Sequence, residues 1–157
     1  MTPAEIRESA EPLDNDIEAA KSAIKRGQMA DAQAHLAGKP SDQAENARKE
    51  LRRLIDLRDG AHLLAKQTEL DAIEAEINAR QPALAKLAEK VRDLKAKFDA
   101  AARPVGRNEV TERARAAAYA PYEKANVEYL DASAELRGLE VRRDQLAREL
   151  AQALGDE

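Results

Sequence analysis

Large apolar residues recur every seven positions between residues 63 and 101. Nine of the ten large apolar residues in this segment lie on two positions of the repeat, whereas chance would place about three of them there. We call this pattern the first seam, and it predicts one long helix with a and d heptad positions. Its members are Leu63, Leu70, Ile77, Leu84, Val91 and Phe98, followed three residues later by Lys66, Ile73, Arg80, Leu87, Leu94 and Ala101.

A second seam of the same kind runs through the last helix that we predict, from about residue 109 to 154. Between the two seams lies a turn at 103–109, marked by a proline, a glycine and an asparagine that can cap the next helix. Two seams joined by a short turn predict an antiparallel coiled-coil hairpin. Each seam keeps its heptad phase across the proline within it, Pro82 in the first and Pro121 in the second. We therefore expect these prolines to kink the helices and not to break them. The second seam consists of Ala118, Tyr122, Ala125, Tyr129, Ala132, Leu136, Leu139, Leu146, Leu150 and Ala153, with Arg143 as a polar exception.

The first part of the chain carries the start and stop signals of several short helices. The stretch Thr2–Glu5 reads as a capping box with proline at the first helical position. Pro12 should end or kink that helix, and helices should then end at Gly27 and Gly38. Residues 19–36 look superficially like the inter-helix turn of a tetratricopeptide repeat, but a single copy favours a plain helical hairpin, since such arrays need about three.

A change of packing partner is predicted near Gly60. Ser41 can cap a helix whose apolar face is Leu51, Leu54, Ile55 and Leu57. Extending the first seam backward from Leu63 would place aspartates on it, so the seam begins only after Gly60. We therefore expect an all-α protein with two parts: a small N-terminal helical hairpin, residues 1–59, and a long, proline-kinked antiparallel coiled-coil hairpin, residues 60–157.

The register of the predicted hairpin has two alternatives. In one, Phe98 lies opposite Ala118 and Arg80 opposite Leu136. One heptad away, Arg80 lies opposite Tyr129, which would allow a cation–π contact. The repeat does not choose between them.

The last helix carries a further set of apolar residues that do not lie on its seam. A bare hairpin would expose them, and a helix that is apolar on more than one side usually has more than one neighbour. Either the N-terminal helices fold back over these residues or another chain covers them, and we favour another chain. We call this set the off-seam line and predict it as a partner interface: Val127, Leu130, Ala134 and Val141.

Composition narrows the class of protein. Charged residues make up 36% of the 157 residues and aromatic residues only 3%, so burial must come from helix seams and not from a large globular core. No cysteine is present, which excludes disulfides and thiolate chemistry. No apolar run approaches 18 residues and the N-terminus has no apolar signal-peptide core, so we expect no membrane insertion and no secretion. Abundant Ala, Arg and Asp suggest a GC-rich bacterial or bacteriophage genome.

Residues suited to catalysis or metal binding are sparse. The two histidines pair with carboxylates at helical spacing, Asp59 with His62 and Asp31 with His35, but neither pair has further ligands. There is no Gly-x-Ser-x-Gly elbow and no Gly-rich phosphate loop. We therefore expect no enzyme, no metal and no cofactor.

The predicted hairpin tip is the most basic part of the chain. Residues 92–115 carry a net charge of +3, whereas residues 1–50 carry −3 and residues 116–157 carry −4. A contact with phosphate or with an acidic partner is one interpretation. A solvated turn is the favoured alternative, because the tip segment lacks aromatics that would stack on single strands. The candidate contacts are Lys95, Lys97, Arg103, Arg107, Arg113 and Arg115.

Together these patterns favour a non-catalytic structural or assembly protein, an elongated helical subunit of a homo-oligomer or larger complex. A bacteriophage virion or scaffold component is one setting, which would place the chain in the cytoplasm or within a virion. Two other functions stay open: a nucleic-acid-associated or regulatory protein that uses the basic tip, and an adaptor or chaperone-like clamp. The expected partner is protein, either self or another subunit.

Overall fold

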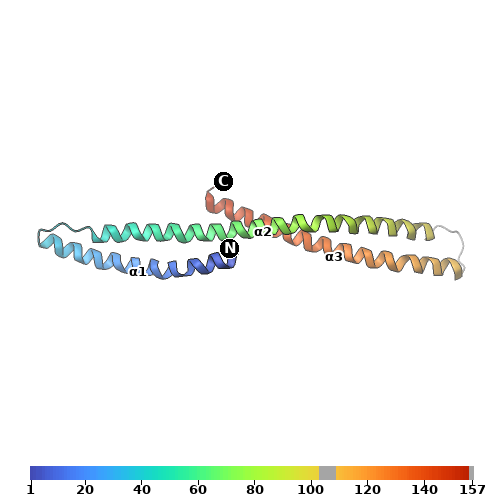
Figure 1. Cartoon of the computed structure of the whole chain (residues 1–157), viewed down its shortest axis with the longest axis horizontal. Coiled ribbons are helices and arrows are strands. Elements are labelled where there is room, and N and C mark those ends of the chain that lie inside the picture. The colour runs from blue at the N-terminus through green and yellow to red at the C-terminus, as the bar shows by residue number, and fades with distance from the viewer. Residues whose placement is uncertain (103–108, 156–157) are drawn as a thin grey trace. The chain divides into compact units, whose positions relative to one another are not determined.

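The computed structural model describes residues 1–102 and 109–155. It contains three helices, α1 (Pro3–Leu36), α2 (Gln43–Ala102) and α3 (Glu109–Leu154), and no strand within the described residues (Figure 1). The all-α prediction is confirmed. The predicted turn residues Pro104, Gly106 and Asn108 lie outside the described residues.

The predicted N-terminal capping box is present at the start of α1. Thr2 N donates to Glu5 Oε2 at 2.6 Å, and Glu5 N donates to Thr2 Oγ1 at 3.3 Å. The hydrogen bond from the Thr2 backbone amide, together with one from the Thr2 side chain, lowers the pKa of the Glu5 carboxyl. At the other end, Gly38 follows α1 with a φ of 67°, a left-handed conformation that favours glycine.

The prediction of several short helices before Gly38 is wrong, because α1 continues through both Pro12 and Gly27. The residues Ile6, Ala10 and Ile17 are buried on one face, with phase kept across Pro12. Packing of this face therefore outweighs the backbone hydrogen bond that Pro12 lacks. Residues 19–36 accordingly form no inter-helix turn.

Gly27 lies in the helix interior because a neighbouring backbone approaches it closely. A Cβ atom at this position would lie 2.7 Å from the backbone nitrogen of Ala44 and 2.9 Å from the carbonyl carbon of Gln43. Glycine lowers helix stability by about 1 kcal/mol relative to alanine, but here it leaves room for the start of α2. Gly27 is thus a packing residue and not a helix stop.

The contacts of the chain divide it into two compact units. Unit 1 comprises Met1–Leu70 together with Glu149–Glu157, and unit 2 comprises Asp71–Arg148. The boundary predicted between residues 59 and 60 lies inside unit 1. The helix α2 continues through Gly60, where an added Cβ would meet no atom within 4 Å.

In unit 1, α1 and the first part of α2 run in opposite directions. Arg7 pairs with Glu69 at 2.8 Å, while Asp14, further along α1, pairs with Arg58 at 3.5 Å. A small apolar core lies between the two helices of this unit. Leu57, predicted on the apolar face, is instead 48% exposed. The core residues are Ile17, Ala20 and Leu54, with Leu13, Leu51 and Ile55 packed against them.

The N-terminus of α2 is capped by a side chain from α1. Asp31 Oδ1 accepts a hydrogen bond from Gln43 N at 3.0 Å, and Asp31 Oδ2 accepts one from Ala44 N at 3.0 Å. Ser41, predicted as the cap, donates its hydroxyl to Asp31. The hydrogen bonds from Ser41 and Ala44 hold the pKa of Asp31 below its ordinary value. The carboxylate satisfies amides that a helix start leaves unpaired.

The last turn of α3 belongs to unit 1, where it lies beside α2. Lys66 Nζ contacts Glu149 Oε2 at 2.9 Å. Leu150 is buried and Ala65 is 0% exposed. A small side chain at Ala65 leaves room for tight packing at this level of the unit. Lys66, one of the two charged members of the first seam, thus makes an ion pair there.

In unit 2, the rest of α2 lies alongside α3 and the two run antiparallel (Figure 1). Arg80 pairs with Glu135 and, further along α2, Lys90 pairs with the earlier Glu128. The predicted seams lie inward, and both helices continue through their prolines. The most buried members in this unit are Ile73, Ile77, Ala125, Leu136 and Leu146.

The register of α2 against α3 agrees with the first of the two alternatives. Phe98 contacts Tyr119 and Tyr122, which lie one and four residues after Ala118. Arg80 lies at the level of Leu136. Its guanidinium pairs with Glu76 and Glu135, and a contact with Tyr129 would need a shift of one heptad.

Candidate interaction surface

The off-seam line is exposed on α3. Val127 is 51% exposed, Leu130 50% and Val141 68%, and Ala134 is exposed as well. By contrast, Ala125 on the second seam is 1% exposed. Such a difference in exposed fraction between residues two to five positions apart follows from helix geometry, since successive side chains point about 100° apart around the helix axis. The line therefore faces away from the α2–α3 contact of unit 2.

The line is apolar but interrupted. Seven residues separate Val127 from Ala134, and seven more lead to Val141, so these three share one face at two-turn spacing. Arg137 lies on the same face between Ala134 and Val141, with its Nε donating to the carbonyl oxygen of Ser133 at 3.3 Å. The surface is thus a row of apolar side chains with charge within it and at its ends, as at the rim of many protein interfaces.

The predicted basic contact surface is only partly available for a ligand. Arg113 pairs with Glu109 at 3.0 Å. Arg115 donates from Nη2 to the carbonyl oxygen of Ala102 at 2.7 Å, which places a cation on the C-terminal end of α2, where the helix dipole favours it. Lys95 and Lys97 are exposed on α2. The remaining two candidates, Arg103 and Arg107, lie outside the described residues.

An aromatic cluster near this end of unit 2 was missed by the sequence analysis. Phe98 stacks on Tyr122 with ring centroids 6.0 Å apart, and Tyr119 completes the cluster at 5.5 Å from Phe98 and 6.4 Å from Tyr122. Tyr119 is 44% exposed and donates to Glu123; that carboxylate raises the pKa of the phenol. The i, i+3 spacing of the tyrosines, together with the correct register, would have revealed the cluster.

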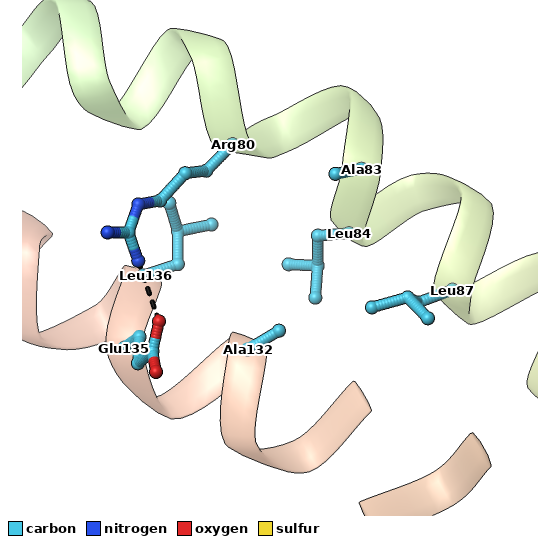
Figure 2. A pocket seen from close by; sticks show the side chains of 7 residues that line it. All are labelled: Arg80, Ala83, Leu84, Leu87, Ala132, Glu135 and Leu136. Carbon is cyan, nitrogen blue, oxygen red and sulfur yellow. Dashed lines mark hydrogen bonds and ion pairs between the residues drawn. The ribbon is translucent and has the colours of Figure 1, made fainter. Parts of the chain in front are cut away.

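A hollow of about 280 Å³ opens between α2 and α3 (Figure 2). Small and branched side chains line most of it, and an ion pair closes one end, where Arg80 Nη1 contacts Glu135 Oε2 at 2.7 Å. Arg80 also donates to Glu76, and these two carboxylates raise the pKa of its guanidinium. The lining residues are Arg80, Ala83, Leu84, Leu87, Ala132, Glu135 and Leu136. Two of the lining residues are alanines, and the lining brings together no nucleophile with an activating base.

The two candidate metal-ligand pairs have other contacts. Asp31 caps α2, and Asp59 accepts from Arg58 Nε at 3.0 Å. Within residues 1–102 and 109–155, no group of three or more His, Cys, Asp or Glu side chains could hold a metal ion. The helices described here include none that is both long and apolar enough to span a membrane.

Comparison with known proteins found no matching family model, no matching curated protein and no matching solved structure.

Proposed function

We propose that this protein is a non-catalytic structural or assembly protein, an elongated helical subunit whose off-seam line is covered by another protein chain. The observation that carries the proposal is the exposure of Leu130 and its apolar neighbours on the side of α3 that faces away from α2. Covering such a row removes apolar surface from water, which stabilises an assembly by about 25 cal/mol per Å².

The division of roles between the two faces of α3 supports this proposal. The second seam already packs on α2 within unit 2, so the off-seam line is not needed to hold that helix pair together. Apolar residues that recur on an otherwise charged helix surface are typical of protein–protein contacts. A bacteriophage virion or scaffold component remains the setting that the small size and the Ala-rich, Arg-rich composition favour.

Size-exclusion chromatography with light scattering tests the proposal. The wild-type chain should self-associate, and Leu130→Glu combined with Val141→Glu should dissociate it while its helical circular dichroism stays unchanged. Leu64→Glu is the matched control, because Leu64 is similarly exposed, at 55%, but lies in unit 1. If the wild-type chain stays monomeric at high concentration, the homo-oligomer is excluded.

A further inference from the structure

Charges on the exposed face of α3 are ordered along the helix. Glu123 lies seven residues before Leu130 and Arg137 lies seven residues after it. Glu112 lies eighteen residues before Leu130 and Arg148 eighteen residues after it. Asp144, fourteen residues after Leu130, also lies on this face but pairs with Arg143. The charges without an ion pair in the described chain are therefore acidic toward the N-terminal end and basic toward the C-terminal end, with Leu130 at the centre.

Helix geometry places these five residues on one face. Seven residues make close to two turns of an α-helix and eighteen make five turns, at 3.6 residues per turn. All five are exposed and all belong to unit 2. The off-seam line lies along the same face, with Glu112 and Glu123 before it, Arg137 within it and Arg148 after it. From Glu112 to Arg148 the face extends about 54 Å, at 1.5 Å per residue.

The charged groups of this face have few partners within the chain. Glu123 accepts one hydrogen bond, from the hydroxyl of Tyr119 at 3.2 Å. Arg137 donates one, from Nε to a backbone carbonyl, which leaves its terminal nitrogens for other acceptors. No carboxylate of the described chain forms an ion pair with Arg137 or Arg148. The four charges are thus available for contacts with another molecule.

We propose that a second copy of this chain docks on this face in the antiparallel direction, with a two-fold axis at Leu130. The inference rests on the proposed assembly function and names the chain that covers the off-seam line. In this arrangement Leu130 meets Leu130 of the second copy, and Glu123 faces Arg137 of the second copy. Glu112 faces Arg148 of the second copy, and Tyr119, 44% exposed, faces Val141. The contact between the two Leu130 residues lies on the axis and occurs once, and each of the other contacts occurs twice, as a two-fold axis requires.

Charge complementarity selects this arrangement over a parallel one. In a parallel pair, each acidic end would lie beside the other copy's acidic end, and each basic end beside its basic end. Exposed ion pairs add little to affinity, but like charges in contact disfavour wrong orientations and so set direction and register. The apolar centre supplies the burial, and the charged ends determine how the two copies align.

Complementary charge reversals provide the first test. Glu123→Arg alone places arginine opposite arginine, and Arg137→Glu alone places glutamate opposite glutamate. Each variant should self-associate about tenfold more weakly than wild type. An equimolar mixture of the two should form a mixed dimer near wild-type strength, because both contacts then join opposite charges. Lys86→Glu, an exposed charge on α2, is the matched control and should leave association unchanged.

Disulfide trapping provides the second test, since the natural chain has no cysteine. Leu130→Cys should cross-link to itself under oxidation. Val141→Cys should not, because the two copies of residue 141 would lie about 33 Å apart, 22 residues at 1.5 Å each. Association without rescue in the mixture, or cross-linking at residue 141 and not at 130, would overturn this arrangement and leave the assembly function standing. A wild-type chain that stays monomeric would overturn both the arrangement and the homo-oligomer.

Discussion

Gly27 of α1 lies directly against the backbone of Ala44 at the start of α2. A Cβ on Gly27 would come within 2.7 Å of the Ala44 nitrogen, a distance that requires the backbone to move. Gly27→Ala should therefore destabilise the protein by about 1–3 kcal/mol, although alanine is the better helix former. Urea unfolding followed by circular dichroism measures this change.

Gly60→Ala is the control for that substitution. Gly60 also lies inside a helix, but an added Cβ would meet no atom within 4 Å. This variant should stabilise the protein by about 0.5–1 kcal/mol. If both variants gained stability, the close approach at Gly27 would be contradicted.

The cap that Asp31 supplies to α2 should make stability depend on pH. The pKa of Asp31 is lowered in the folded protein by its hydrogen bonds with Ser41 and Ala44. The stabilisation is therefore fully present above the unfolded pKa of about 3.9 and is lost as the pH falls through the lower folded pKa. Asp31→Asn should lower the urea midpoint at pH 7, and its difference from wild type should shrink below about pH 4.

Asp16→Asn controls for the change of net charge in that experiment. Asp16 is exposed on the same helix and takes part in no cap. Its substitution should leave the urea midpoint within experimental error at both pH values. An equal loss from Asp16→Asn and Asp31→Asn would show that net charge, and not the cap, governs the effect.

The two faces of unit 2 should respond differently to truncation. Ile77 is 4% exposed on the first seam, so Ile77→Ala should destabilise the protein by about 2–5 kcal/mol. Val141 is 68% exposed, so Val141→Ala should change stability by less than about 0.5 kcal/mol and act mainly on association. Thermal unfolding at low concentration, compared with light scattering at high concentration, separates the two effects.

The aromatic cluster gives a local probe of the end of unit 2. Phe98→Leu removes the ring that contacts both Tyr119 and Tyr122 and should cost about 1 kcal/mol. With no tryptophan in the chain, near-ultraviolet circular dichroism reports the tyrosines and should weaken. Tyr129→Phe, a change in the third tyrosine, should leave most of the signal. A signal unchanged by Phe98→Leu would contradict the stacked arrangement.

The sequence by itself was enough to predict the helices on either side of residues 103–108 and the faces that they bury. Ile77 and Leu136 lie inside because heptad spacing puts them on one side of their helices, a property of the local backbone that needs no knowledge of the partner. The same spacing placed Leu130 off the seam. The last helix ends at Leu154 as predicted, and Gly155 follows it with a φ of 77°.

Tertiary contacts determine the features that local sequence signals predicted wrongly or left open. Gly27 and Pro12 weaken a helix in isolation, but packing of α1 on α2 outweighs that local cost and α1 stays whole. Asp31 is thirteen residues from Ala44, so no local capping rule could assign it as the cap of α2. The register joining Phe98 to Tyr122 depends on how two helices meet, because a seven-residue repeat is equally satisfied one heptad away, and only the side chains in contact distinguish the two.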